Sequence, residues 1–298
     1  MLRSEFIKVF SLKRWTICIL SFILINFVSL NLNFKSNDNT EWRKEAISTK
    51  DIYLDMINKY GNNEIYEKEI RAIDYSLENN IPYNVGNIWS YLSYIDNYFN
   101  IIILILIIIA SRVFYIEYEY ATWKNLLMSS KDIKQIILSK YIYCIIEITI
   151  SILVLFCITF IFGLFEFGLT QPNNIVAFKE ENTQIISQLD MVIERVLTLY
   201  LVGLFYMSMT NFLIILFDGK KVAIFSVISI LFFAGLINIL LEKIIPNFNR
   251  LLPFYYISKR LDIIQSNKLI YSIIMLSYSI IILTGGMFVF LNRRYKIV

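Results

Sequence analysis

The chain has 298 residues, of which 57% are apolar and 17% charged, and its formal net charge is +4. Soluble domains are usually about 45–50% apolar. Here the excess is gathered in long runs with almost no charge, which is typical of membrane-spanning helices. The chain has no histidine, which excludes histidine metal sites and histidine-based catalysis. Its three cysteines lie inside apolar runs, so neither a disulfide framework nor a cysteine zinc site is expected.

The first residues, 1–14, predict a short amphipathic helix on the membrane surface. Leu2, Phe6 and Val9 share one helical face, and Ser4, Lys8 and Ser11 lie on the opposite face. A solvated N-terminal turn is the alternative. No small-residue cleavage site follows the first apolar run, so we expect this run to be an uncleaved anchor.

Six segments are long and apolar enough to cross a bilayer, since about 20 helical residues span its hydrocarbon core. The sequence therefore predicts an all-α, polytopic integral membrane protein with about six transmembrane helices, forming one membrane domain over residues 1–298. The predicted spans are Trp15–Phe34, Ile95–Tyr115, Tyr141–Phe165, Val196–Phe217, Val222–Leu241 and Leu269–Leu291.

Lysine and arginine in the loops predict the orientation, because basic residues are enriched on the cytosolic side. If the N-terminus is cytosolic, the interior segments hold 13 Lys and Arg in 50 residues, and the exterior segments hold 14 in 117. We therefore expect both termini in the cytosol.

The segment 35–94, between the first two spans, predicts a small extracytoplasmic helical insertion. Apolar residues recur at helical spacing on either side of the stop signal at 61–63, which indicates two short antiparallel helices. A surface that receives substrate and a solvated cap without a binding role are both open.

The segment 116–140, on the interior side, carries Glu119, Thr122, the pair Leu126 and Leu127, and then Lys140 before the third span. This pattern resembles the signature of ABC-2 type permeases, in which a Glu, a Gly-Thr, a Leu pair and a Lys follow in this order. Ala121 stands where glycine is usual. The resemblance implies that the residues coupling the chain to an ATPase are Glu119, Ala121, Thr122, Leu126, Leu127 and Lys140. An interfacial helix on the inner leaflet is the alternative.

The resemblance also implies a function: the permease subunit of an ATP-binding-cassette exporter in a bacterial cell membrane. The substrate would be amphipathic or hydrophobic, such as a peptide, an antibiotic or a lipid. The expected partners are a cytosolic ATPase subunit, a second permease copy or a related permease, and the lipid bilayer, but no nucleic acid.

The chain has no phosphate-binding loop, because its Gly219-Lys220 pair lacks the flanking residues of that motif. We therefore expect no enzymatic activity, no catalytic residue, no metal and no bound cofactor in this chain, with ATP and Mg²⁺ on the partner subunit. The alternative function is a non-transporting membrane immunity or sensor protein that binds a peptide through its exterior helices.

Two further sets of residues are candidates for function. Glu147 and Asn26 are polar residues within predicted spans, where an ionisable group is a functional candidate by default. The alternatives for Glu147 are a position near the inner interface, where its side chain reaches the water, and pairing with a neighbouring helix. Pro253, Phe254 and Tyr255 precede the last span, where the resemblance implies an outer gate and an aromatic belt is the alternative.

Overall fold

The computed structural model describes residues 11–33, 42–61, 63–83, 86–119, 133–179, 182–217, 219–245, 249–258 and 260–294. Within them, six helical segments are long and apolar enough to cross a membrane. These segments are Leu12–Asn31, Ile88–Glu117, Lys134–Phe167, Gln188–Phe217, Lys220–Ile244 and Leu269–Asn292. The predicted fold class is confirmed: the chain is an all-α, multi-pass membrane protein.

The elements follow one another as helices, interrupted once by a short hairpin of strands. In chain order they are α2 (Leu12–Asn33), α3 (Trp42–Tyr60), α4 (Glu64–Glu78), α5 (Ile88–Tyr94), η1 (Ile95–Tyr98), α6 (Phe99–Glu119), α8 (Ile133–Phe167), β1 (Asn174–Lys179), β2 (Asn182–Ser187), α9 (Gln188–Phe217), α10 (Lys220–Ile244), η2 (Asn249–Leu251), α11 (Pro253–Ser258) and α12 (Arg260–Arg294).

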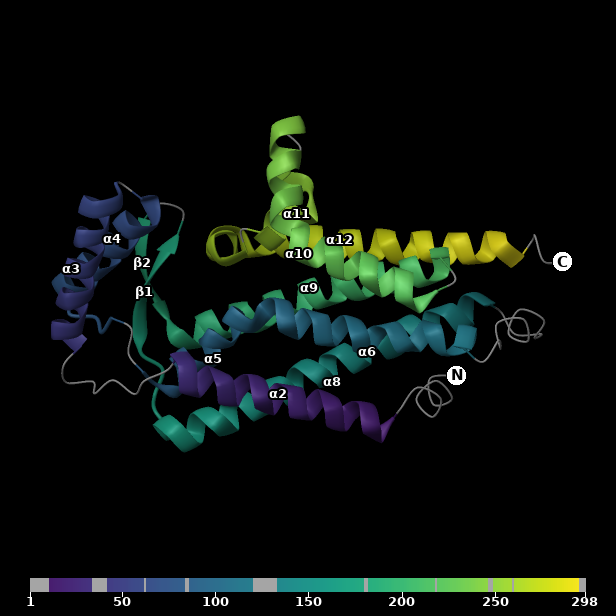
Figure 1. Ribbon diagram of the computed structural model, residues 1–298, viewed down its shortest axis with the longest axis horizontal. Coiled ribbons are helices and arrows are strands. Elements are labelled where there is room, and N and C mark those ends of the chain that lie inside the picture. The colour runs from purple at the N-terminus through teal and green to yellow at the C-terminus, as the bar shows by residue number, and fades with distance from the viewer. Residues whose placement is uncertain are drawn as a thin grey trace.

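Helices α2, α6, α8, α9 and most of α12 run along the longest axis of the molecule, whereas the part of the chain at α11 projects to one side (Figure 1). At one end, which we call the hairpin end, lie α3, α4 and the two strands. At the opposite end, the termini end, α2 begins and α12 ends (Figure 1). An even number of spans requires this arrangement, since each span carries the chain from one end to the other.

Helix α9 lies at the centre of the bundle and packs against α6, α8, α10 and α12. Glycines allow close approach at the contact between α6 and α9 and at the contact between α8 and α12. A Cβ atom on Gly203 would lie 3.2 Å from Leu106, and one on Gly286 would lie 2.8 Å from the Tyr141 hydroxyl. Small residues at helix contacts are the usual means of tight packing in membranes, where no hydrophobic force between helices operates.

The helical insertion between the first two spans is confirmed as an antiparallel pair. Along α3 and α4, Arg43 donates to Asn80, Lys50 pairs with Asp74 at 2.5 Å, and Tyr53 stacks on Tyr66. As the residue number increases along α3, the residue number of its partner decreases. The two helices therefore run in opposite directions.

The helices extend beyond the predicted spans, since a helix continues past its apolar part where the polar ends reach water. Helix α8 begins eight residues before Tyr141. The segment 166–195, between the third and fourth predicted spans, contains an antiparallel hairpin in which Ile175 pairs with Ile186. Its β-branched residues favour strands. Residues 1–10 of the predicted amphipathic helix lie outside the described residues, while residues 12–14 belong to α2.

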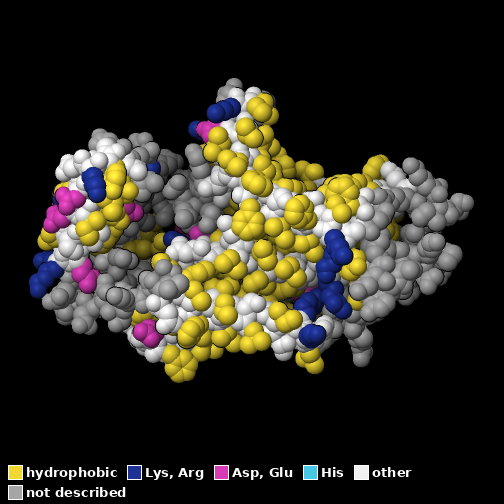
Figure 2. All heavy atoms as spheres, in the orientation of Figure 1, with side chains coloured by type: hydrophobic (Ala, Val, Ile, Leu, Met, Phe, Trp, Pro, Cys, Tyr) yellow, Lys and Arg dark blue, Asp and Glu magenta, His cyan; other side chains and the backbone are white. Residues whose placement is uncertain are grey.

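The surface matches a protein that sits in a bilayer (Figure 2). Hydrophobic side chains cover the middle of the visible face, both acidic and basic side chains lie over α3 and α4, and a further group of Lys and Arg lies toward the termini end. Large apolar side chains such as Phe225 and Leu269 are 73% and 80% exposed. Exposure of this kind is stable against lipid tails, whereas water would oppose it.

Candidate functional site

An apolar groove opens on the side of the bundle between α8 and α9, in the half nearer the hairpin end. Its volume is about 510 Å³, and two of its side chains, Leu153 and Ile193, are 58% and 56% exposed toward the outside of the bundle. The hydroxyls of Thr149 and Tyr200 lie 3.4 Å apart within it. The lining residues are Thr149, Ile152, Leu153, Phe156, Val192, Ile193, Val196, Leu197 and Tyr200. We call this the lateral groove.

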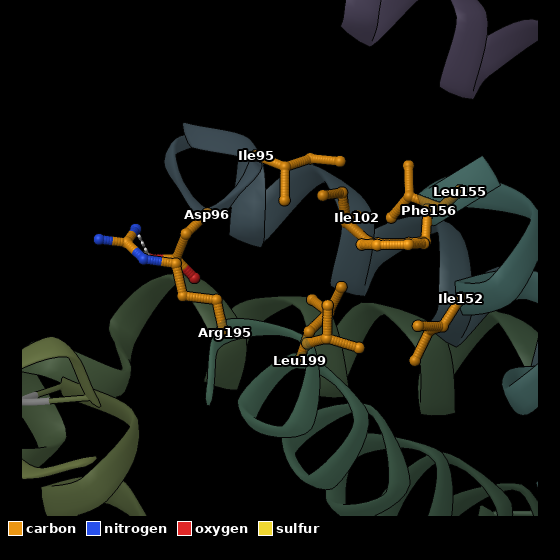
Figure 3. Close-up of a pocket in the computed structure, with 9 residues that line it drawn as sticks. Ile95, Asp96, Ile102, Ile152, Leu155, Phe156, Arg195 and Leu199 are labelled. Atoms are coloured by element: carbon orange, nitrogen blue, oxygen red, sulfur yellow. Dashed lines mark ion pairs between the residues drawn. The ribbon is translucent and has the colours of Figure 1, made fainter. Parts of the chain in front are cut away.

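A small cavity of about 20 Å³ lies behind the lateral groove and shares Ile152, Phe156 and Val196 with it. Figure 3 shows apolar side chains around the cavity, with Asp96 and Arg195 together at one end. A space of this size holds about one water molecule. Behind the lateral groove, the side chains of the bundle are therefore packed almost without space between them.

The Asp96–Arg195 ion pair forms the far wall of this small cavity. The Arg195 guanidinium lies 3.8 Å from the Asp96 carboxylate and donates to the Ser93 carbonyl at 3.0 Å. Asp96 is 4% exposed and Arg195 19%. The sequence analysis missed this pair, although an aspartate inside a predicted span was a signal that could have revealed it.

Beyond Arg195 lies a polar cavity of about 460 Å³ at the hairpin end, which we call the exterior cavity after the orientation predicted from the loop charges. Its wall includes Glu69, which accepts a hydrogen bond of 2.8 Å from the Tyr83 hydroxyl. Burial, followed by the charge of Glu69, raises the pKa of Tyr83 above its usual range. The lining residues are Tyr53, Glu69, Pro82, Tyr83, Ser90, Ser93, Tyr94, Asn97, Ile175, Val176, Met191 and Arg195.

A network of neutral hydrogen bonds joins α5 to the start of α9 at this end. Asn87 donates to the Gln188 side-chain oxygen at 2.8 Å, and the Asn173 amide donates to the same oxygen at 3.0 Å. Gln188 in turn donates to the Ser90 hydroxyl at 2.8 Å. Asn87 also caps α5 by accepting from the Ser90 amide. Gln188 thus holds three segments together through its side chain.

At the termini end, a buried ion pair joins α6 to α8. The Lys140 ammonium lies 3.0 Å from the Glu117 carboxylate and donates to the Val113 carbonyl at 3.3 Å, and the two side chains are 0% and 2% exposed. Lys140 also lies over the Phe114 ring. Lys140 was predicted to couple the chain to an ATPase. Its side chain is instead buried against α6.

A second ion pair joins α2 to α8 nearby. The Arg14 guanidinium donates to the carboxylate of Glu147, which is 2% exposed. Arg112, on α6, also interacts electrostatically with this carboxylate. The sequence analysis identified Glu147 as a candidate without naming its partner, and the pairing alternative describes the geometry observed.

The other predicted residues divide into two groups. Asn26 accepts a hydrogen bond of 2.9 Å from the Tyr91 hydroxyl, which ties α2 to α5. Pro253 is buried, while Phe254 contacts Phe205 and Tyr255 contacts Tyr256, both edge to face. The remaining coupling residues are not described: the backbone of Glu119 ends α6 but its side chain lies outside the described residues, as do Ala121, Thr122, Leu126 and Leu127.

Nothing in the described part of the chain gathers three or more metal-binding side chains. The polar residues of the described site instead hold helices together or line the two larger cavities. Taken with the fold, this arrangement defines a multi-pass helical membrane protein with an apolar groove on its side and a polar cavity at one end.

The sequence places the chain in a protein family. Residues 62–295 match the family described as "Protein of unknown function (DUF2705)", and since this is most of the chain, the chain belongs to that family. The chain is also similar to "Uncharacterized protein YhcI" of Bacillus subtilis (strain 168), with 32% identity over 174 residues. That match covers 55% of this chain and 54% of the relative, so it spans about half of each protein.

Proposed function

We propose that the chain is the membrane-spanning permease subunit of an ATP-binding-cassette exporter. It moves an amphipathic or hydrophobic substrate out of the cytoplasm or the membrane, and a separate cytosolic ATPase subunit supplies the energy. A second copy or a related permease completes the pathway. The proposal places the chain in a bacterial cell membrane with both termini in the cytosol.

The observation that carries the proposal is the attachment of the segment between α6 and α8. This segment contains the stretch that resembles the ABC-2 signature. The buried pair of Glu117 and Lys140 joins the two helices that flank it. A force applied to the segment would therefore reach two spans together, and through Glu147 and Arg14 also a third. This is the mechanical requirement for a segment that passes the movement of an ATPase into a bundle.

The lateral groove supports the same proposal from the substrate side. A substrate dissolved in the bilayer can reach an apolar groove on the bundle's side without leaving its apolar surroundings. The groove then leads toward the exterior cavity, with the Asp96–Arg195 pair between them. Such a path suits a substrate with both an apolar and a polar part.

The proposal is tested by recovery of the ATPase. Replacing Leu126 and Leu127 by Asp puts two charges where apolar anchors would enter a partner's groove, at a cost of several kcal/mol. We expect the variant to reach the membrane at the wild-type level, to recover no ATPase on purification from native membranes, and to lose transport. Lys221→Asp, in the first turn of α10, is a control for added charge. Undiminished recovery of an ATPase by the double variant would overturn the docking role.

The orientation is tested by cysteine labelling in intact cells. Single cysteines at Ser48, which is exposed on α3, and at Ser187 are expected to react with a membrane-impermeant thiol reagent. A cysteine at Ser130 is expected to react only after permeabilisation. Reaction of the Ser130 cysteine in intact cells would reverse the assignment of the two ends.

The exterior cavity favours a second candidate function, a non-transporting immunity or sensor protein. A cavity of about 460 Å³ between α4, the hairpin and the bundle is large enough to hold part of a peptide. This function predicts ligand binding in cells that lack every ATPase partner, together with no movement of the ligand across the membrane. Recovery of an ATPase with the wild-type chain, and transport that depends on it, would exclude this function.

A further inference from the structure

The lateral groove and the exterior cavity are lined from one short stretch of α9. Met191 and Arg195 line the exterior cavity, while Val192, Ile193 and Val196 line the lateral groove. A single turn of helix therefore separates an apolar surface open to the side from a polar cavity at the hairpin end. A molecule that touches both surfaces must be amphiphilic, with its apolar part on one side of this turn and its polar part on the other.

The charged side chains of the exterior cavity determine which charge the polar part of such a molecule carries. Arg195 is turned toward the Asp96 carboxylate and the Ser93 carbonyl, which balance its charge. Glu69 then remains as the carboxylate of the cavity wall, with a neutral hydroxyl from Tyr83 as its hydrogen-bond donor. The rings of Tyr53, Tyr83 and Tyr94 stand in the same wall. A carboxylate among aromatic rings attracts a cation through both charge and ring faces.

We propose that these two surfaces form one binding site for a cationic amphiphile. Its alkyl chain lies in the lateral groove between α8 and α9, and its positively charged head group lies in the exterior cavity near Glu69. The Asp96–Arg195 pair stands between the two parts, so its two side chains move apart when the molecule occupies both surfaces. This inference rests on the proposed function for its purpose, since it names the substrate class, but the binding itself requires no ATPase.

The experiment uses the purified full chain in bilayer discs of zwitterionic lipid, without any partner. The probe is a single saturated alkyl chain with a trimethylammonium head group and a photoreactive diazirine near the chain end. A second probe carries a sulfate head group on the same chain. Photolabelled peptides are quantified by mass spectrometry over a range of probe concentrations. We expect saturable labelling of the stretches 149–156 and 192–200, and weaker binding of the sulfate probe.

Matched variants separate the two parts of the site. Leu153→Trp fills the lateral groove and is expected to reduce groove labelling several-fold, whereas Leu236→Trp, at a similarly exposed position on α10, leaves it unchanged. Glu69→Gln is expected to raise the Kd of the ammonium probe about threefold, which is the scale of a partly solvated ion pair. Glu78→Gln, exposed on the same helix and outside the cavity, leaves the Kd unchanged.

Three results would overturn the inference. The first is labelling of α8 and α9 that does not saturate and equals that of the exposed α10 face, since this would be simple partition into the bilayer. The second is a sulfate probe that binds as tightly as the ammonium probe, or a Glu69→Gln variant with the wild-type Kd. The third is cross-linking across the groove between two copies of the chain, which would make it a subunit interface.

The two proposals fail in different ways. Absence of labelling in a chain that still recovers an ATPase would remove the binding site and leave the exporter. Saturable labelling in a chain that recovers no ATPase would leave the binding site and remove the exporter.

Discussion

The two ends of the bundle are held together by different chemistry. At the termini end, α8 is joined to α6 by the Glu117–Lys140 pair and to α2 by the Arg14–Glu147 pair, with both carboxylates 2% exposed. At the hairpin end, hydrogen bonds between neutral amides and hydroxyls around Gln188 join α5 to α9. There the ion pair of Asp96 and Arg195 is longer, at 3.8 Å, and lies beside a polar cavity.

This difference indicates which end can open. Separating a buried ion pair leaves two charges in an apolar surrounding, which is costly. Separating neutral groups beside a wet cavity costs less, because water can replace the lost partners. The termini end is therefore expected to move as one body, and the hairpin end to open between α5, α8 and α9. The four predictions that follow compare the two ends, from the largest expected effect to the smallest.

Lys140→Met at the termini end is expected to have the largest effect. It leaves the Glu117 carboxylate buried without its cation, at a cost of about 3–5 kcal/mol in the free energy of unfolding. Thermal unfolding of the purified chain in detergent measures the loss. Lys134→Met, exposed on the same helix, is the control. The double variant Glu117→Gln/Lys140→Met is expected to recover much of the loss, and failure to recover would mean that packing rather than charge explains it.

Arg14→Gln, the second prediction, tests the pair that joins α2 to α8. Losing a hydrogen bond between charged groups is expected to lower the free energy of unfolding by about 1.5–3 kcal/mol. The neighbouring Lys13→Gln, which is exposed, is expected to leave it unchanged. In a double-mutant cycle with Glu147→Gln, the two changes should not add. Simple additivity would show that the pair contributes nothing to the contact between the helices.

At the hairpin end, Gln188→Ala removes three hydrogen bonds between α5, α9 and the segment before β1. We expect a loss of about 1–2 kcal/mol, smaller than for Lys140→Met, because no charge is left unpaired. Leu189→Ala, more exposed in the same turn, serves as control. A loss as large as that of Lys140→Met would remove the contrast between the two ends.

Tyr83→Phe, also at the hairpin end, is expected to have the smallest effect, under about 1.5 kcal/mol. The raised pKa of Tyr83 means that its phenol stays neutral in the folded protein to a higher pH than in the unfolded chain. The contact with Glu69 therefore contributes stability below a pH of about 10, the ordinary pKa of tyrosine, and loses it as the pH rises further. Ultraviolet titration of wild type and of Tyr83→Phe measures this, with the exposed Tyr60→Phe as control. An ordinary titration of Tyr83 would refute its burial.

Periodicity was enough to predict parts of the molecule that depend on local sequence. The apolar runs predicted six spans, and the stripes around Tyr53 and Ile70 predicted the antiparallel pair of α3 and α4. The hairpin of β1 and β2 was missed. Its apolar residues, such as Val176 and Ile185, are few and close to the membrane, so their pattern did not stand out from a loop.

The candidate site was predicted only in part. Glu147 was singled out because a charge within an apolar run is conspicuous, and Lys140 because it matches the resemblance to ABC-2 permeases. Their partners Arg14 and Glu117 were not, because each lies on a different helix and no rule of spacing along the chain connects them. The Asp96–Arg195 pair was missed for the same reason.

The sequence by itself determined that this chain crosses a membrane as helices. In a bilayer every backbone polar group must be hydrogen-bonded within the protein, and continuous apolar runs of this length achieve this as helices, since the strands of a membrane barrel are shorter and alternate apolar with polar residues. Only the tertiary structure decided which faces of those helices meet. Apolar side chains such as Leu153 and Ile152 are alike in sequence, yet the first is 58% exposed at the rim of the lateral groove and the second is 5% exposed. In lipid, the packing of helices depends on the shapes and polar groups that meet at each contact, and apolar residues facing lipid are as stable as those facing another helix.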